Sequence, residues 1–244
     1  MDSHSGQRAE RQGNLVVERL RAAGSVFAED EARLLGDDEE LVARRIAGER
    51  LEHVLGWAEF GGLRIEVDPG VFIPRPQTEA LANYAASLRP AVALDLFAGS
   101  GAIACVIKDR HPAARVVAAE RDPIALGCAR RNGARFGVEV VAADVDAGVP
   151  RELEGQVDVL TANVPYVPSR ELPYVPHDGE PAAALDGGPD GLDWLRRVAS
   201  IARRWLKPTG RLLIELPEGV ETMPLEGFRV SSPVERVLSA EPLR

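Results

Sequence analysis

The tetrapeptide Asn163-Val164-Pro165-Tyr166 follows an apolar run and offers groups that could hold a flat nitrogen. A planar nitrogen, in an amide or in the exocyclic amine of a base, is a weak nucleophile because its lone pair is delocalised. A site that methylates it must hold both N–H groups with neutral acceptors, such as the side-chain oxygen of Asn163 and the main-chain carbonyl of Val164. Pro165 would stiffen the loop, and Tyr166 would offer a ring face. The pattern predicts catalysis mainly by positioning, with a simple proline turn as the structural alternative.

The stretch from Asp95 to Gly101 could bind a nucleotide-like cofactor, because it joins the end of a predicted strand to the start of a predicted helix. Glycines there let the backbone approach a ligand, with the helix N-terminus behind it. The run Gly99-Ser100-Gly101-Ala102-Ile103-Ala104 also matches the dinucleotide fingerprint with alanine at its last place. A tight turn with no ligand is the structural alternative.

Three acids follow successive predicted strands and favour S-adenosylmethionine over a nicotinamide dinucleotide as that cofactor. Asp95 could meet an ammonium group and would repel a pyrophosphate. Glu120 is suited to accept ribose hydroxyls, and Asp144 is suited to accept an adenine amino group. Any one of them could be an exposed loop acid, but three at successive strand ends favour a binding site.

The elements that must position these residues alternate between strands and helices. Alternation of this kind predicts an α/β fold, a mostly parallel sheet with helices on both faces. The expected strands cover 91–96, 116–119, 138–141, 157–161 and 212–216, the expected helices cover 102–110, 123–136 and 192–206, and a short antiparallel pair is expected at 228–230 and 236–239.

The chain before this region has a different pattern. Apolar residues recur at helical spacing from Leu15 to Val54, and the period shortens toward two between Gly56 and Val67, which indicates a β-hairpin. A proline-rich elbow follows at Ile73-Pro74-Arg75-Pro76, and residues 1–13 are interpreted as a frayed tail. We therefore expect a small N-terminal helical region with a hairpin at 1–74, for substrate recognition, and a cofactor-binding domain at 75–244.

Composition narrows the classes of partner. The 244 residues carry 29 Lys and Arg against 38 Asp and Glu, a formal net charge of −9, which disfavours a phosphate-rich partner such as a nucleic acid. Aromatic residues make up only 5%, which argues against a base-stacking single-strand binder. Cys105 and Cys128 stand in apolar-periodic stretches and are interpreted as reduced core residues. We expect no metal site, no secretory signal, no membrane span and a cytoplasmic location.

Taken together, these residues resemble the protein N5-glutamine methyltransferase family of the HemK/PrmC type, which modifies the Gly-Gly-Gln loop of peptide-chain release factors. The segments that carry the likeness are 56–60, Phe72 to Glu79, Asp95 to Ala104, Asn163 to Tyr166, Glu180-Pro181 and Leu185 to Leu192. The elbow and the last segment are its specific part, since methyltransferases in general do not share them.

The resemblance implies a Rossmann-like class I methyltransferase domain that uses S-adenosylmethionine. It also implies that Asn163, Val164, Pro165 and Tyr166 hold a substrate glutamine. Three features depart from the family pattern: Val164 replaces a second proline, Phe97 stands where glycine is common, and the N-terminal region is shorter. The residues expected to touch the cofactor are Asp95, Phe97, Ala98, Gly99, Ser100, Gly101, Glu120, Asp144, Val145 and Asn163.

The residues leave other functions open. A ribosomal-protein glutamine could replace the release factor as substrate, and a nucleic-acid methyltransferase acting on adenine N6 or guanine N2 would use the same tetrapeptide and flip the base into it. A non-enzymatic adaptor that keeps the fold is a third possibility, and a nicotinamide dehydrogenase comes last because no hydride-transfer acid–base pair is evident.

Overall fold

The computed structural model describes residues 14–174, 179–218, 220 and 222–243, and it divides the chain into two compact units, Met1–Trp57 and Ala58–Arg244. We expected the boundary after residue 74. The structure instead assigns most of the hairpin, and the whole elbow, to the larger unit. The physical reason is apolar packing, because Phe60 and Ile65 of the hairpin are buried in the same cluster as Val106. The expected tail at 1–13 lies outside the described residues.

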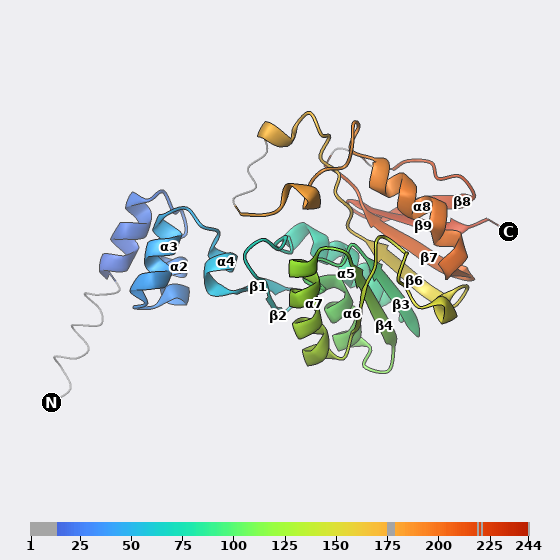
Figure 1. Ribbon diagram of the computed structural model, residues 1–244, viewed down its shortest axis with the longest axis horizontal. Coiled ribbons are helices and arrows are strands. Elements are labelled where there is room, and N and C mark those ends of the chain that lie inside the picture. The colour runs from blue at the N-terminus through green and yellow to red at the C-terminus, as the bar shows by residue number, and fades with distance from the viewer. Residues whose placement is uncertain (1–13, 175–178, 219, 221, 244) are drawn as a thin grey trace. The chain divides into compact units, whose positions relative to one another are not determined.

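The larger unit is built on a seven-stranded sheet in the order β5-β4-β3-β6-β7-β9-β8 (Figure 1). The first five strands in this order are parallel, while β9 pairs antiparallel with both β7 and β8. The predicted terminal pair is confirmed and is longer than expected. The strands are β3 (Val92–Leu96), β4 (Arg115–Glu120), β5 (Glu139–Ala142), β6 (Val157–Ala162), β7 (Leu206–Glu215), β8 (Phe228–Val234) and β9 (Val237–Pro242).

Helices cover both faces of this sheet, as predicted (Figure 1). They are α5 (Glu79–Ser87), α6 (Ala102–Arg110) and α7 (Pro123–Phe136) on one face and α8 (Asp193–Trp205) on the other. Strand alternation explains the two cores: Leu94 packs in the cluster that contains Leu195 of α8, while its neighbour Ala93 packs in the cluster that contains Ile103 of α6. Helix α5 was not predicted, because its alanine-rich sequence has a weak apolar period.

Local chemistry explains where α7 begins and ends. The Asp122 carboxylate caps its first turn by accepting from the amides of Ile124 and Ala125, at 2.9 and 3.0 Å. Pro123 occupies the first helical position, where no amide hydrogen is needed. Gly137 closes the helix in a left-handed conformation with φ of 84°. These signals place the helix at the bounds that the sequence predicts.

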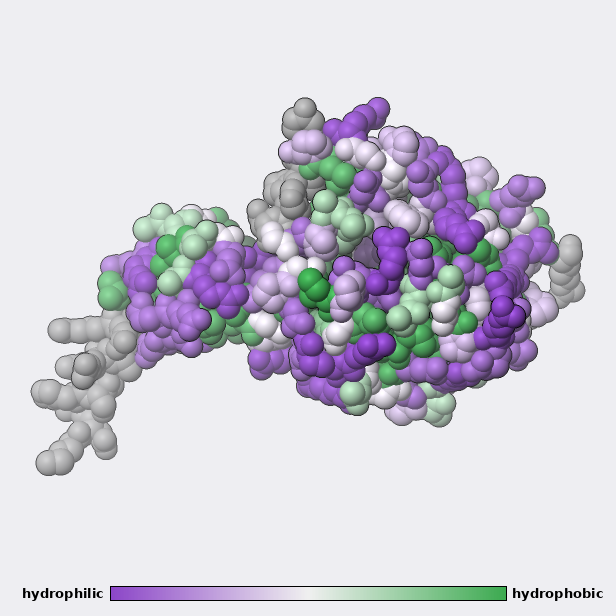
Figure 2. Space-filling view, viewed as in Figure 1, coloured by the Kyte–Doolittle hydropathy of each residue, from purple (hydrophilic) through white to green (hydrophobic). Residues whose placement is uncertain are grey.

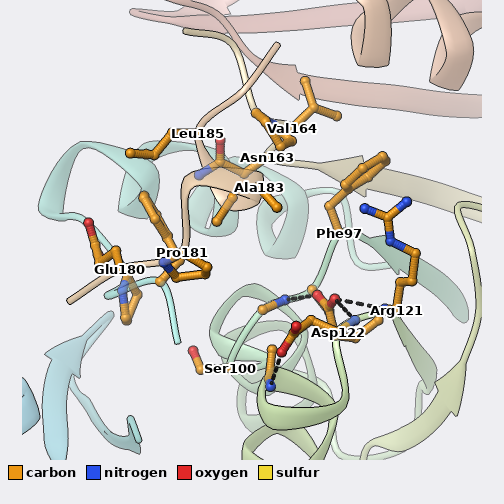
Figure 3. A pocket seen from close by; sticks show the side chains of 18 of the residues that line it. Phe97, Ser100, Arg121, Asp122, Asn163, Val164, Glu180, Pro181, Ala183 and Leu185 are labelled. Carbon is orange, nitrogen blue, oxygen red and sulfur yellow. Dashed lines mark hydrogen bonds between the residues drawn. The ribbon is translucent and has the colours of Figure 1, made fainter. Parts of the chain in front are cut away.

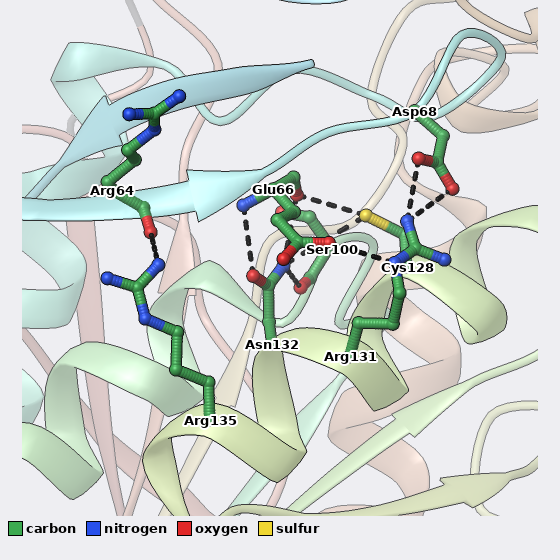
Figure 4. Close-up of polar contacts among 8 residues, drawn as sticks. All are labelled: Arg64, Glu66, Asp68, Ser100, Cys128, Arg131, Asn132 and Arg135. Carbon is green, nitrogen blue, oxygen red and sulfur yellow. Dashed lines mark hydrogen bonds and ion pairs between the residues drawn. The ribbon is translucent and has the colours of Figure 1, made fainter.

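Asn132 of α7 joins the hairpin of β1 (Trp57–Phe60) and β2 (Leu63–Glu66) to the glycine loop (Figure 4). Its side-chain oxygen accepts from the amide of Glu66 at 2.9 Å, and its side-chain nitrogen donates to the carbonyls of Glu66 and Ser100, each at 2.9 Å. The side chain is fully buried, so all three bonds are shielded from water. One residue thereby fixes two segments that are far apart in the sequence.

The smaller unit is helical, as the sequence predicts. It contains a helix over 14–22 followed by α2 (Ala28–Leu35), α3 (Glu39–Ile46) and α4 (Leu51–Leu55). Its core includes Leu20, Leu35 and Val42. Apolar side chains also reach its surface, including Val26 and Phe27, which are 84% and 66% exposed, and Figure 2 shows apolar side chains gathered on these helices. No helix in the described part of the chain is long and apolar enough to cross a membrane.

Candidate active site

A cavity of about 520 Å³ lies at the carboxyl ends of the parallel strands. The strands are in register there, with Leu96 opposite both Ala119 and Ala162, so the loops that follow them converge. The order of the strands also reverses at β3, the position at which open α/β sheets bind ligands. Of the predicted site residues, the cavity is lined by Phe97, Ala98, Gly99, Ser100, Glu120, Asp144, Val145, Asn163, Val164, Pro165 and Tyr166, whereas Asp95 and Gly101 are not among its lining residues.

The glycine loop follows β3 and is held in a left-handed conformation at several positions. Phe97, Gly99 and Gly101 have φ values of 57°, 56° and 80°. The conformation is strained for Phe97, which carries a Cβ, and this explains why glycine suits that position. The Phe97 ring packs edge-on against Trp194, with centroids 5.4 Å apart. This ring contact is one that a glycine at position 97 could not make.

Glu120 ends β4 and holds the glycine loop directly. Its Oε2 accepts from the amide of Gly99 at 2.7 Å, and its Oε1 accepts from the amides of Arg121 and Asp122 at 2.7 and 2.8 Å. A carboxylate has about four acceptor positions, so these bonds leave room for about one more donor. A ligand that presents two hydroxyls to Glu120 would therefore have to displace one of the amides.

Asp144 and Arg121 lie at the adjoining part of the cavity. The Arg121 Nη1 is 3.2 Å from Asp144 Oδ1, and both side chains are more than half exposed, so the pair is weak and can open for a ligand. The Arg121 guanidinium also stands 5.6 Å from the centre of the Trp194 ring. In Figure 3, Phe97 and Arg121 lie on one side of Asn163, with Glu180 and Pro181 on the other.

Asp95 is buried at the end of β3, with 1% of its surface exposed. One carboxylate oxygen accepts from the Thr161 hydroxyl at 2.7 Å, and the other has no hydrogen-bond partner among the described residues. Burial raises the pKa of Asp95 to about 7, and the nearby charge of Glu120 adds to the rise, while the hydrogen bond from Thr161 and the nearby Ala104 amide oppose it. This carboxyl can therefore change its protonation near neutral pH.

The acceptor tetrapeptide follows β6. The Asn163 Nδ2 donates to the Thr78 hydroxyl at 3.3 Å, and Val164 is 2% exposed. Burial raises the pKa of the Tyr166 hydroxyl, with a smaller contribution from the charge of Glu215, so this hydroxyl stays protonated at neutral pH. The backbone of Tyr166 is braced from behind, because a Cβ on Gly191 would come within 2.4 Å of its carbonyl oxygen.

The elbow and the segment after residue 179 form another wall of the cavity. The Glu180 side chain is wholly buried, accepting from the Ile73 amide at 2.7 Å and pairing with the Arg75 guanidinium at 2.5 Å. The Arg75 guanidinium also lies over the Phe72 ring, 4.7 Å from its centre. Buried charge of this kind needs a partner, so these contacts tie the two segments together.

Sequence reasoning missed several functional candidates around the cavity. Three of them, Arg75, Thr78 and Glu180, lie in segments that carry the family resemblance, but the sequence analysis assigned them no role. The other two, Arg121 and Trp194, were not identified by any sequence signal. A search for charged residues within the family motifs would have found Arg75 and Glu180, whereas Thr78 carries no charge that would single it out. All five line the cavity.

The histidines that the structure describes and the arginines of α8 do not line the cavity. Neither of the two histidines that the structure describes, His53 and His111, lines it, while His4 and His177 lie outside the described residues. The arginines on α8 lie near acids, as shown by Arg196 with Asp190 at 2.6 Å and Arg204 with Glu154 at 2.5 Å. These helix faces thus carry mixed charge, in agreement with their interpretation as solvated surfaces.

Comparisons with known proteins identify the family of this chain. The methyltransferase small domain family matches residues 63–174. A release factor glutamine methyltransferase of Mycolicibacterium smegmatis is 43% identical over 221 residues, 88% of this chain and 78% of that protein. One from Geobacter sulfurreducens is 39% identical, covering 73% of this chain and 64% of the relative. The chain thus spans a little under two thirds of this second relative.

Two further proteins are less similar: the first has a different stated activity, and the second has a much lower sequence identity. A 4-amino-L-phenylalanine/4-methylamino-L-phenylalanine methyltransferase of Streptomyces pristinaespiralis is 37% identical, over 71% of this chain and 63% of the relative. The solved 16S rRNA N2 G1207 methyltransferase of T. thermophilus, 20% identical with a TM-score of 0.53, covers 77% of this chain and 50% of its own and supports the fold alone. The fold is that of class I methyltransferases, and the identity to the mycobacterial relative over most of both chains shows that this chain belongs to the release factor glutamine methyltransferase family.

Proposed function

We propose that the protein transfers a methyl group from S-adenosylmethionine to the side-chain amide nitrogen of a glutamine, in the Gly-Gly-Gln loop of a peptide-chain release factor. S-adenosylmethionine is the cofactor of the family. The observation that carries the proposal is that Asn163 and the glycine loop line one cavity. That shared cavity would allow the acceptor nitrogen and the methyl donor to meet.

The lining residues suit this cofactor. The backbone amides of the glycine loop, which is left-handed at Phe97 and Gly99, would hold the methionine part, and Glu120 would accept from the ribose, as the sequence predicts. Asp144 and Val145 would border the adenine, with Asp144 accepting from its amino group. Asp95 does not line the cavity, and one of its buried oxygens has no partner among the described residues. It would influence cofactor binding indirectly, through the glycine loop that follows it.

The acceptor would be held by the chain's own oxygens. The Asn163 side-chain oxygen and the Val164 carbonyl would accept the two N–H hydrogens of the glutamine amide, with Pro165 and Tyr166 bordering the flat group. The sulfonium of the bound cofactor supplies an activated methyl group. As the nitrogen bonds to the methyl carbon, the bond from that carbon to sulfur would break and its electron pair would stay on sulfur, so that the cofactor would leave as a neutral thioether. The proton on the methylated nitrogen would then be acidic and pass to solvent, so the step needs no strong base.

Charge supports a protein substrate over a nucleic acid. The net charge is −9, and the arginines of α8 lie beside acids rather than on an open basic face. The N-terminal helical unit, Met1–Trp57, would take part in recognising the release factor, which would place the reaction in the cytoplasm. A ribosomal-protein glutamine is the second candidate substrate of the same chemistry.

The test replaces Asn163 with alanine and measures methyl transfer to a Gly-Gly-Gln peptide and to an intact release factor. Turnover should fall by about a hundredfold or more, because positioning carries the rate, while cofactor affinity changes much less. The matched control is Asn83→Ala, at an exposed position on α5. Added methyl mass on nucleic acid but not on protein, or unaltered turnover of Asn163→Ala, would contradict the proposal.

A further inference from the structure

Behind the acceptor tetrapeptide, residues from three separate segments approach one another. Glu215 ends β7, and the parallel register of Ala162 with Ile214 places it beside Asn163. Thr78 ends the short helix before α5, and Arg236 lies in the turn between β8 and β9. Glu215 and Thr78 are 2% and 3% exposed, so their polar groups must find partners inside the protein.

We propose that Glu215 and Thr78 are positioning residues that set the direction of the Asn163 amide, so that its oxygen and not its nitrogen faces the substrate. This inference rests on the proposed function of Asn163. The two residues touch neither substrate nor cofactor in this scheme. They act through the hydrogen bond between Thr78 and Asn163.

The direction follows from counting donors. The Thr78 hydroxyl opposes the rise that burial causes in the pKa of Glu215, as a hydrogen-bond donor to the carboxylate does. An ionised carboxylate can only accept, so in this bond Thr78 donates its single hydrogen. The Thr78 oxygen can then only accept from Asn163, whose Nδ2 is 3.3 Å away. The amide oxygen of Asn163 is thereby left to accept from the glutamine N–H. If the Asn163 amide were turned the other way, its NH2 group would face the N–H groups of the glutamine, and two donors would meet.

Arg236 supports the charged state of this carboxylate. Its Nη2 is 3.7 Å from Glu215 Oε1 and 3.5 Å from the Tyr166 hydroxyl. Burial raises the pKa of Glu215, while Thr78 and Arg236 lower it. The backbone of Arg236 has φ of 60°, an uncommon conformation for a residue with a Cβ, and its Nε is buried without a hydrogen-bond partner among the described residues. The turn thus holds a guanidinium beside both Glu215 and the acceptor loop.

The first experiment compares Thr78→Val with Thr78→Ser. Valine keeps the shape but removes the hydroxyl, and turnover on the Gly-Gly-Gln peptide should fall about tenfold to a hundredfold. Serine keeps the hydroxyl and should restore turnover to within about threefold of the unaltered protein. Cofactor affinity should be unchanged in both variants. Thr209→Val, an exposed position toward the other end of β7, is the matched control.

The second experiment compares Glu215→Gln with Glu215→Met. The Oε2 of Glu215 has no partner among the described residues, so a glutamine can place its amide nitrogen there and keep an accepting oxygen toward Thr78 and Arg236. Glu215→Gln should therefore retain turnover, whereas Glu215→Met should lose about tenfold or more. Thermal unfolding of each variant establishes that it is folded.

A readout independent of transfer separates this inference from the proposed function. In 15N-labelled protein, the Asn163 side-chain NH2 resonance, assigned through its loss in Asn163→Ala, should shift in Thr78→Val and stay in place in Thr78→Ser. That shift supports the inference even if the unaltered protein methylates no Gly-Gly-Gln peptide, which would overturn only the proposed substrate. Three results would overturn the inference about Thr78 and Glu215. They are an unshifted resonance in Thr78→Val, an equal loss of turnover in the valine and serine variants, and full turnover in Glu215→Met.

Discussion

The Arg75 guanidinium lies 2.5 Å from the wholly buried carboxylate of Glu180, 105 residues further along the chain. The second oxygen of that carboxylate accepts from the Ile73 amide at 2.7 Å. The two segments that make the family resemblance specific are therefore joined by a charged contact in the wall of the cavity. Their co-occurrence in the sequence has a physical reason, since each satisfies the polar groups of the other.

Replacing Glu180 with alanine should leave the Arg75 charge unpaired and the Ile73 amide unsatisfied. Because truncating one partner of a buried pair is costly, the free energy of unfolding should fall by about 3 to 5 kcal/mol. The KM for the proposed peptide should rise more than the Kd of the cofactor. Urea unfolding and steady-state kinetics measure these effects. Glu171→Ala, which removes an exposed pair with Arg170, is the control, and an equal effect of both changes would contradict the prediction.

Gly191 and Gly155 form a matched pair for testing the support of the acceptor loop. Both have positive φ, 80° and 66°, so alanine strains each backbone by about 1 kcal/mol. Only at Gly191 would the new Cβ meet the Tyr166 carbonyl oxygen, at 2.4 Å, since nothing lies within 4 Å at Gly155. Gly191→Ala should therefore reduce methyl transfer strongly, while Gly155→Ala should lose some stability and keep its turnover. Similar turnover in the two variants would show that Gly191 does not support the backbone of Tyr166 in the way proposed.

Trp194 should contribute to cofactor binding through its ring. It lines the cavity beside Phe97 and Arg121, and loss of an aromatic contact costs about 0.5 to 1.5 kcal/mol, so Trp194→Ala should weaken cofactor binding up to about tenfold. Trp194→Phe keeps a ring but loses the indole bond to the Asp186 carbonyl at 2.9 Å, and it should bind the cofactor nearly as well as the unaltered protein. Calorimetric titration with S-adenosylmethionine measures both, and unchanged affinity in Trp194→Ala would refute the role.

Asp95 should make stability depend on pH. Its pKa rises from 3.8 to about 7 on folding, so the native state favours the protonated form. The contribution of this carboxyl to the free energy of unfolding should be largest below about pH 4, fall as the pH rises, and level off above about pH 7. Asp95→Asn lacks this titration. Between about pH 4 and pH 7, the free energy of unfolding of the variant should therefore rise relative to that of the unaltered protein by roughly 4 kcal/mol.

Urea unfolding without cofactor, at several pH values between 4 and 8, checks the Asp95 prediction. Asparagine can still accept from Thr161 and can place its nitrogen where the carboxylate oxygen has no partner among the described residues, so the variant should fold. Parallel pH profiles for the two proteins would show that Asp95 is not the titrating group.

Much of the fold could be predicted because its signals are local. Helices α6 and α7 occupy the predicted ranges, since glycine precedes the first and an Asp-Pro cap opens the second. Helix α5 escaped prediction because its buried residues, among them Leu81 and Ala85, form a mostly alanine face whose apolar character emerges only when it packs on α6. The domain boundary also moved, because Phe60 and Ile65 are buried by residues far along the chain.

The sequence by itself indicated the candidate site, because the glycine loop, the acids after successive strands and the Asn163 tetrapeptide were each predicted from residue types and from their positions after predicted strands. The tertiary structure decided which groups are buried together. It placed Asp95 outside the cavity lining, used most of the Glu120 acceptors on backbone amides, and brought Thr78 and Glu215 toward Asn163. The reason is physical: burial and hydrogen-bond direction depend on neighbours supplied by other elements, and spacing along the chain does not encode them.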